Sequence, residues 1–277
     1  MAAERGHDVT LFDADDKIGG QFNIAKQIPG KEDFNETLRY FGKMLEKHRV
    51  TVKLSWRVGV NDLASFDEVI VATGILPRKP GIPGVDHPKV LSYLDVIRDR
   101  KPVGKSVAVI GAGGIGFDVS EYLTHSHSED EKAQWYKEWG VDTALAHRSA
   151  LVPADVAPSP RQIYLLQRKE SSVGKNLGKT SGWVHRAQLH KKGVEMIPGV
   201  SYDRIDDQGL HITVKGKSRL LAVDNVIICA GQEPDRSLAD ALISKGIKTH
   251  VIGGADVAAE LDAKRAINQG SRLAATL

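Results

Sequence analysis

The sequence predicts an α/β protein that contains two interleaved β-α-β units. Short segments rich in Val, Ile and Leu alternate along the chain with segments of helical period. A glycine-rich turn joins one such strand, Ser106–Ile110, to the helix that follows it. The C-terminal tail repeats the strand–turn–helix pattern of the N-terminal part. We therefore expect the first unit to be interrupted by the second.

Elements of the first unit are predicted from apolar periodicity and from glycine positions. Met1–Gly6 has the pattern of a last helical turn closed by a glycine. A compact domain seldom starts there, so we expect the initial strand and glycine loop of this unit to be missing upstream. The remaining predicted elements are the strand Val9–Phe12, the helix Phe34–His48, the strands Val50–Leu54, Glu68–Ala72 and His250–Ile252, and a last helix from about Glu260 to Thr276.

Between the units, the segment Leu76–Pro88 holds four prolines and is predicted to be an irregular connector. The expected domains are therefore 1–88 with 247–277, and 89–246 with a polar insertion at about 126–160. The predicted elements of the second domain are the strands Ser106–Ile110, Gln162–Gln167, Glu195–Ile197, His211–Val214 and Asn225–Ala230, and the helices Phe117–His125, Glu131–Trp139 and Trp183–Lys192.

The composition excludes several classes of protein. The chain has 277 residues, and 38 Lys and Arg against 35 Asp and Glu leave a net charge of +3, which is too small to indicate nucleic-acid binding. Its apolar runs are far shorter than the roughly 20 residues that span a bilayer. The single cysteine, Cys229, excludes an internal disulfide, a Cys-x-x-Cys pair and a cysteine-held iron–sulfur cluster within this chain. No secretory signal pattern is present, so a cytoplasmic protein without a membrane partner is expected.

The glycine-rich turn fits the pattern G-x-G-x-x-G, with Gly111, Gly113 and Gly116 at its fixed positions. The first glycine permits the tight turn, the second lets the backbone approach a pyrophosphate, and the third allows close packing of helix on strand. The N-terminus of the helix that follows offers unpaired N–H groups to the phosphates. The strand–turn–helix setting favours dinucleotide binding over an empty glycine turn, and thus two Rossmann-like, three-layer domains.

The type of dinucleotide is predicted from the end of the next strand. NAD sites place an acidic residue there, whereas NADP sites place cations for the 2′-phosphate. Here the strand is followed by Arg168 and Lys169, which favours NADPH. The insertion stretches the usual spacing, and a solvated basic turn is the alternative interpretation.

Asp13 ends a strand at the position that contacts an adenosine ribose in such folds, and Gly19, Gly20 and Gln21 follow as a flexible turn. An ordinary strand-end cap is an equally good interpretation of Asp13. Thr73 with Gly74, and Ala230 with Gly231, each end a strand at an expected domain crossover.

No catalytic residue and no metal site is predicted. His125, His127 and His147 lie in the polar insertion without metal-ligand spacing. No G-x-S-x-G elbow occurs. The segment Gly174–Arg186 is consistent with a nicotinamide contact, although a plain loop-to-helix entry explains it as well.

Taken together, these motifs resemble the C-terminal part of the bacterial NADPH-dependent 2,4-dienoyl-CoA reductases, which are old-yellow-enzyme-type iron–sulfur flavoproteins. The resemblance runs along the whole chain. It is carried in order by residues 9–13, 19–23, 104–117, 177–183, 228–234 and 252–256.

The resemblance implies a reductase part that binds FAD and NADPH, with hydride passing from NADPH to FAD. FMN, a [4Fe–4S] cluster and the substrate would belong to an N-terminal β/α barrel that this chain lacks. That barrel, or an equivalent subunit, is the expected partner. The alternatives are an NADPH-binding remnant without flavin, or a related pyridine-nucleotide oxidoreductase with another acceptor.

Residue by residue, the resemblance assigns the glycine loop, Arg168 and Lys169 to NADPH, and Asp13, Gln21 and Asp256 to FAD. Three residues of the last helix would close over the isoalloxazine ring. The full set of expected cofactor-binding residues is Asp13, Gly20, Gln21, Val58, Thr73, Gly74, Gly111, Gly113, Gly116, Arg168, Lys169, Asp256, Lys264, Arg265 and Ala266.

Overall fold

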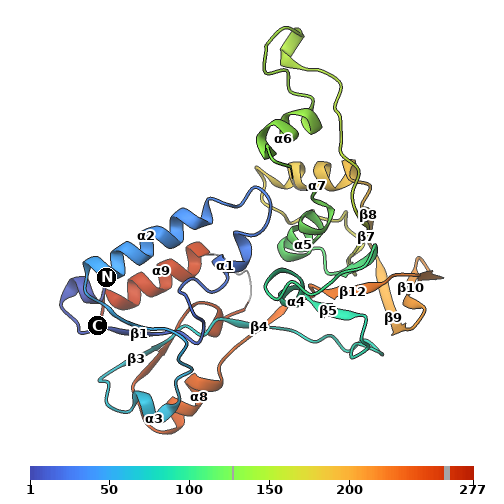
Figure 1. Cartoon of the computed structure of the whole chain (residues 1–277). Coiled ribbons are helices and arrows are strands. Elements are labelled where there is room, and N and C mark those ends of the chain that lie inside the picture. Colours follow the sequence, from blue (N-terminus) through green and yellow to red (C-terminus); the bar gives the residue numbers. More distant parts are fainter. Residues whose placement is uncertain (127, 259–262) are drawn as a thin grey trace. The chain divides into compact units, whose positions relative to one another are not determined.

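The computed structural model describes residues 1–126, 128–258 and 263–277 (Figure 1). The chain forms two compact units. Unit 1 consists of Met1–Lys26, Gly30–Arg78 and Gly231–Leu277, and unit 2 of Gln27–Pro29 and Lys79–Ala230. The predicted interleaving is therefore present, and the fold is the predicted α/β class.

Unit 2 is organised around a five-stranded parallel sheet. Its strands lie in the order β5 (Val90–Ser92), β12 (Asn225–Ile228), β6 (Ser106–Ile110), β7 (Gln162–Leu166) and β8 (Glu195–Ile197). The central strand β6 is almost wholly buried. A parallel strand buried on both faces needs an unbroken apolar run, which is how the sequence of β6 reads.

Different layers cover the two faces of this sheet. The helix α5 (Gly114–Thr124) packs against α4 (Tyr93–Ile97) and against α7 (Gly182–Lys191). A second, antiparallel sheet of β9 (Val200–Asp206), β10 (Gly209–Val214) and β11 (Lys217–Leu221) shares a core with Ala108 and Ile110 of β6. Because successive strand residues face opposite sides, these two residues define the face that the second sheet covers.

The insertion of unit 2 carries the helix α6 (Glu131–Trp139), which matches its predicted range, and the short turn η2 (Arg148–Ala150). Figure 1 shows α6 and the segment that follows it beyond α7 within this unit. A single bridge joins Val141 to Leu151.

The sheet of unit 1 is divided into separate two-stranded ladders among the described residues. β1 (Thr10–Phe12) pairs in parallel with β2 (Thr51–Lys53), and β3 (Val69–Val71) pairs in parallel with β14 (Thr249–Val251). The helices of the unit are α1 (Phe22–Ala25), α2 (Phe34–Lys47), α3 (Val60–Leu63), α8 (Ser237–Ser244) and α9 (Ala263–Ala274), with the short turns η1 (Ala3–Arg5) and η3 (Gly253–Ala255).

The sequence predicted a helical element at each end of unit 1. Gly6 closes η1 in a left-handed conformation, as the glycine predicted. The last helix is described from Ala263, and its expected start at Glu260 lies outside the described residues. None of the described helices is long and apolar enough to cross a bilayer.

The connector between the units differs from the prediction. Leu76 and Pro77 belong to strand β4 (Ile75–Pro77), which pairs antiparallel with β13 (Gln232–Pro234). Proline is tolerated there because this ladder has only two strands, so each strand is an edge. The units consequently exchange at Arg78/Lys79 and Ala230/Gly231, rather than at 88/89 and 246/247.

Several elements were not predicted. They are the strands β4, β5, β9, β11 and β13 and the helices α1, α3, α4 and α8. In β11 the first four residues are exposed and only Leu221 is buried, so the strand has no alternating pattern to detect. The helix α5 begins at Gly114 rather than at Phe117, because the glycine loop itself supplies its first turn.

Candidate functional site

Each glycine of the loop between β6 and α5 has its own reason to lack a side chain. Gly111 has a φ of +107°, and a Cβ there would lie 2.6 Å from the carbonyl oxygen of Cys229. At Gly116, a Cβ would lie 1.8 Å from the carbonyl oxygen of Gly111. At Gly113, no described atom lies within 4 Å of a Cβ position. Gly111 and Gly116 therefore serve the fold, and Gly113 borders open space that a ligand can approach.

The loop also leaves the start of α5 open. Gly113 is the N-cap residue, and among the described residues no side chain caps it. The first-turn N–H groups of a helix attract anions, both as hydrogen-bond donors and through the helix dipole. β6 and β12 are neighbours at which the strand order reverses, and ligands of open α/β sheets bind at such a point. The geometry is that of a dinucleotide-phosphate cradle.

Arg168 and Lys169 follow β7 in a loop that is held by its backbone. Gln167 donates from its side chain to the carbonyl of Lys169, at 2.9 Å, and Lys169 also accepts from the amide of Gly199. Both cations are exposed, and no carboxylate of the described residues pairs with either. Burial raises the pKa of the Tyr202 phenol, and the nearby charge of Arg168 opposes that rise. Two cations that no carboxylate of the described structure balances thus follow β7, the strand next to β6.

In unit 1, the turn after β14 packs closely on the turn after β3. A Cβ on Gly254 would lie 2.8 Å from Cγ2 of Ile75 and 3.1 Å from the carbonyl carbon of Gly74. Thr73, beside Gly74, donates its hydroxyl to the carbonyl of Asp235 at 2.6 Å. The structure therefore brings Thr73 and Gly74 together with the η3 turn.

Gln269 of α9 links that turn to Asp256. Its side-chain oxygen accepts from the amide of Gly253 at 2.8 Å, and its side-chain nitrogen donates to Oδ2 of Asp256 at 2.8 Å. In the same helix, Arg265 donates to the carbonyl of Val257. The Nε of Arg265 is buried and has no partner among the described residues. An orphaned buried donor is costly, which marks this helix start as a place for an absent acceptor.

The other expected residues of α9 lie beside this network. Ala266 approaches the turn, since a Cβ on Gly253 would lie 3.6 Å from its methyl group. Lys264 is exposed. Val58 has a different surrounding, because it packs against the hydrophobic cluster formed by β3 and α8.

Asp13 has the local contacts of a strand-end cap. Its Oδ1 accepts from the amide of Asp15 at 3.0 Å, and its backbone bonds to Lys53 and Trp56. The Oδ2 atom has no hydrogen bond to the described residues. One oxygen therefore closes the turn, and the other makes no hydrogen bond within the described structure. Gly20, with a φ of +47°, and Gln21 are exposed at the start of α1.

Two histidines of the insertion, His125 and His147, have acidic partners. Nε2 of His125 lies 3.2 Å from Glu131, and Nδ1 of His147 lies 2.9 Å from Asp142. His127 lies outside the described residues. Within the described ranges, no group of three or more potential metal ligands occurs.

Two further features lie near the glycine loop, and only the first of them was not predicted. Glu121 of α5 is buried and accepts from Nδ1 of His185, in α7, at 2.6 Å. Burial raises the pKa of the Cys229 thiol, and the charge of Asp118 acts in the same direction, so this thiol is a poor nucleophile. The link from Gln269 to Asp256 was also missed, because a glutamine inside a helix carries no sequence signal of its partner.

The comparisons with known proteins agree with this geometry. The sequence profile of the pyridine nucleotide-disulphide oxidoreductases matches residues 1–264. The chain is 25% identical to a metal reductase of Desulforamulus reducens, over 92% of this chain and 38% of that protein. It is 27% identical to an NADH oxidase of Thermoanaerobacter brockii, over 92% and 35%.

A solved structure of 2-naphthoyl-CoA reductase, in complex with 2-naphthoyl-CoA, shares the fold with a TM-score of 0.82 and 24% identity. That similarity covers 100% of this chain and 37% of the solved chain. This chain therefore spans less than two fifths of the length of each of these proteins.

Proposed function

Because the chain belongs to the pyridine nucleotide-disulphide oxidoreductase family, we propose that it is the reductase part of a 2,4-dienoyl-CoA reductase-type flavoprotein, which passes hydride from NADPH to FAD. When bound, the two cofactors supply the redox chemistry: a hydride with its two electrons leaves the nicotinamide and reduces the flavin. The protein contributes binding sites and relative position. Dithiol chemistry is not part of the proposal, because Cys229 is the only cysteine.

The observation that carries the proposal is that the three loop glycines lack a side chain for different reasons. Gly111 and Gly116 are required by backbone packing, whereas Gly113 is required only if a ligand approaches it. A pyrophosphate at the N-terminus of α5 accounts for that open space. Family members bind FAD and NAD(P)H, which agrees with such a ligand.

The preference for NADPH over NADH is proposed from Arg168 and Lys169. Their loop is anchored through backbone contacts, so their side chains are available to a ligand. A 2′-phosphate would supply the negative charge that the described residues do not supply.

FAD fits the residues of unit 1 on two observations. The buried Nε of Arg265 has no acceptor among the described residues, and Asp256 is oriented by Gln269. We assign Asp256 to the ribityl–phosphate region of FAD, Asp13 to its ribose, and Lys264, Arg265 and Ala266 to the flavin ring. Gly20, Gln21, Val58, Thr73 and Gly74 complete the proposed flavin side of the site.

The reduction of an unsaturated CoA thioester is assigned to the whole protein rather than to this chain. We propose that a barrel domain or a separate subunit carries FMN, the iron–sulfur cluster and the substrate site. The length of the similar proteins supports this proposal, since the chain spans only 37% of the solved reductase. That reductase was solved with a CoA thioester, which supports the substrate class proposed here.

The test is a visible spectrum of the purified chain after loading with FAD and removal of free flavin, followed by anaerobic NADPH. We expect retained flavin that bleaches promptly with NADPH and much more slowly with NADH. The control is Gly113→Ala, in which the added methyl group meets no atom of the described residues within 4 Å. This variant should keep its thermal stability and its flavin but bleach slowly, because the methyl group hinders the pyrophosphate. Unchanged bleaching in Gly113→Ala would contradict the assigned coenzyme site.

A second candidate function is coenzyme binding without retained flavin. The observation that favours it is the divided sheet of unit 1, in which the described β1 and β14 each pair on one side only. A flavin site built on such a sheet would need a further segment to complete it. In the same experiment, loss of all flavin with intact NADPH binding would support this candidate.

A further inference from the structure

The exposed apolar side chains of unit 2 are concentrated in one part of it. Among the described residues of this unit, the large apolar side chains that are exposed are Trp135, Leu145, Leu151, Trp183 and Leu220. All but Leu220 lie in the insertion or on α7. Single apolar side chains scattered over a surface are ordinary, whereas a concentration of them indicates a site of interaction.

Three tryptophans of this region form a continuous stack. Trp135 and Trp139, which are one turn apart on α6, stack with their ring centroids 5.7 Å apart. Trp139 in turn meets Trp183 of α7 edge to face, with the centroids 6.2 Å apart. Because residues four apart share one face of a helix, Glu131 lies in line with Trp135 and Trp139. We call these three residues the α6 stripe.

The packing of α6 on α7 explains only part of the stack. Trp139 is half-buried, since it lies between the other two rings. Trp135 is still 44% exposed and Trp183 57% exposed. A tryptophan stabilises a structure mainly through the apolar area that it buries. The two outer rings therefore suit a further surface that packs on them.

The N-terminal end of the α6 stripe is acidic. Glu129, Asp130 and Glu131 follow one another at the start of α6, and all three are exposed. Lys132 is the next residue, so these four positions carry a net charge of −2. The side chain of Glu131, which begins the stripe, is 53% exposed.

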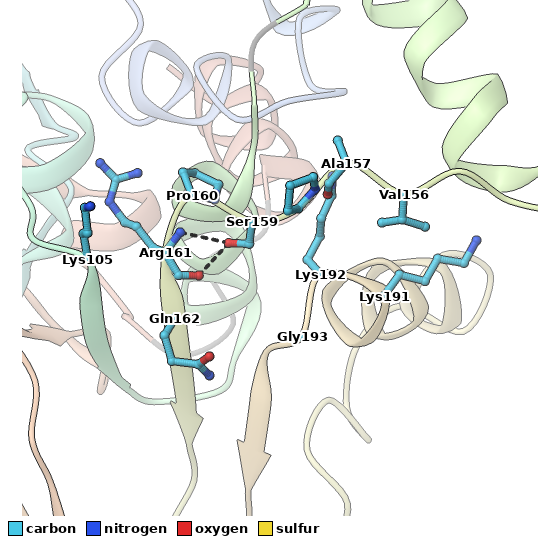
Figure 2. Close-up of a pocket in the computed structure, with 11 residues that line it drawn as sticks. Lys105, Val156, Ala157, Ser159, Pro160, Arg161, Gln162, Lys191, Lys192 and Gly193 are labelled. Carbon is cyan, nitrogen blue, oxygen red and sulfur yellow. Dashed lines mark hydrogen bonds between the residues drawn. The ribbon is translucent and has the colours of Figure 1, made fainter.

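The C-terminal end of the stripe is basic. Lys191 of α7 donates to the main-chain carbonyl of Glu138 at 3.0 Å, and its amine lies 4.0 Å from the centre of the Trp139 ring. Figure 2 shows the Lys191 side chain directed away from that of Arg161. The carboxylate of Glu138 is paired with Lys192. The amine of Lys191 is thus a positioned positive charge at this end.

A surface of this kind is complementary to itself. A two-fold axis at Trp135 would set two α6 helices antiparallel and bring this ring against its equivalent. Glu131 and Trp139 each lie about one turn from Trp135, so Glu131 of one copy would face Trp139 of the other. Lys191 lies beside Trp139, so the acidic end of each copy would meet the cation of the other. Apolar rings would lie at the centre and charges at the rim.

We propose that the α6 stripe and Trp183 bind a second copy of this chain, in a symmetric dimer with antiparallel α6 helices. Opposite charges at symmetric positions favour a second copy over a different protein, which would not need them. Three rings and a short charged rim make a small interface. We therefore expect a weak dimer, with a dissociation constant of about 1–100 μM.

The test is sedimentation equilibrium of the whole chain from about 1 μM to about 1 mM, in which we expect a reversible monomer–dimer equilibrium. Trp135→Gln should raise the dissociation constant at least about tenfold, because the ring at the axis is lost from both copies. Leu220→Gln removes an exposed apolar side chain elsewhere in unit 2 and should leave it within about twofold. A chain that stays monomeric, or a dimer that is unchanged in Trp135→Gln, overturns the proposal.

Two charge reversals test the antiparallel arrangement. Glu131→Lys and Lys191→Glu each set like charges opposite one another, so each variant alone should dimerise at least about tenfold more weakly. An equal mixture of the two should associate about as tightly as the unchanged chain, because opposite charges meet again at both ends. Mixing does not rescue a misfolded variant, so this recovery separates a lost contact from a lost fold.

Lys137→Glu is the matched control for the charge reversals. Lys137 is exposed on α6 and lies two residues after Trp135, about 200° around the helix and thus off the stripe. This variant should leave the dissociation constant within about twofold. The proposal is overturned if the mixture associates no more tightly than either variant alone, or if Lys137→Glu weakens the dimer as much as Lys191→Glu does.

Discussion

The two turn regions that the two units offer to cofactors are built in different ways. In unit 2 the glycine loop follows β6, which has a parallel neighbour on each side and is buried along most of its length. In unit 1 the corresponding turns follow β1, β3 and β14, which pair in twos, and β1 and β14 are only half-buried. In unit 1, side-chain hydrogen bonds contribute more to fixing the turns, as the bond from Gln269 to Asp256 shows. A site can thus be shaped by the backbone or by side chains that span the turns.

The largest difference between the two units is expected when one glycine of a turn in each unit is replaced by alanine. In Gly116→Ala the new methyl group would lie 1.8 Å from a backbone oxygen of the loop. We expect unit 2 to lose at least about 4 kcal/mol of its free energy of unfolding. Gly254→Ala meets a side chain at 2.8 Å and backbone at 3.1 Å, so unit 1 should lose about 1–2 kcal/mol. Urea unfolding of both variants measures the difference, and equal losses would show that the two turns are equally rigid.

The second-largest effect is expected on the preference for NADPH over NADH. Removing both cations with Arg168→Gln and Lys169→Gln should raise the dissociation constant of NADPH about 10- to 100-fold. The dissociation constant of NADH should stay within about twofold of the unchanged chain. Fluorescence titration with each nucleotide makes the measurement. A matching loss for NADH would mean that the two residues support the fold or the shared part of the coenzyme.

In unit 1 we test the side chain of Gln269, which bonds both to Gly253 and to Asp256. Gln269→Leu leaves the amide of Gly253 unpaired and releases Asp256, so the dissociation constant of FAD should rise about five- to tenfold. Gln269→Glu keeps the acceptor but loses the donor, and it sets a second carboxylate beside Asp256. Flavin fluorescence after gel filtration measures retention. If Gln269→Glu retains flavin better than the unchanged chain, the positioning role is wrong.

The smallest effect is expected in the insertion, far from both turns in the sequence. The His147 side chain, followed by backbone amides, lowers the pKa of Asp142 from 3.8 to about 2. A depressed acid pKa stabilises the fold above the unfolded pKa, and this contribution is lost as the pH falls through the folded value. Pepsin cleavage within 142–150 should therefore accelerate as the pH drops from about 4 toward 2.

Asp142→Asn supplies the control for this pH effect. It should be cleaved fast throughout that range, with little further change as the pH falls. A persistent acceleration in this variant would assign the pH effect to another group.

Local patterns in the sequence predicted the elements that carry their own signal. The apolar run of β6, its glycine loop and the helix α6 all occur where they were expected. The order of strand and helix patterns along the chain also predicted the interleaved α/β fold. The C-terminal tail has the same strand–turn–helix pattern as the first unit, so it was expected to belong to that unit. These features depend on neighbours in the chain, so the sequence alone determined them.

Tertiary structure decided what depends on distant residues. Strand β4 forms at the start of the proline-rich connector because β13, from a distant part of the chain, pairs with it. The bond from Thr73 to Asp235 and the close packing of Gly254 on Gly74 likewise arise from segments that meet only in the fold. Pairing energy and burial act across such distances in the chain, and neither leaves a local pattern to find.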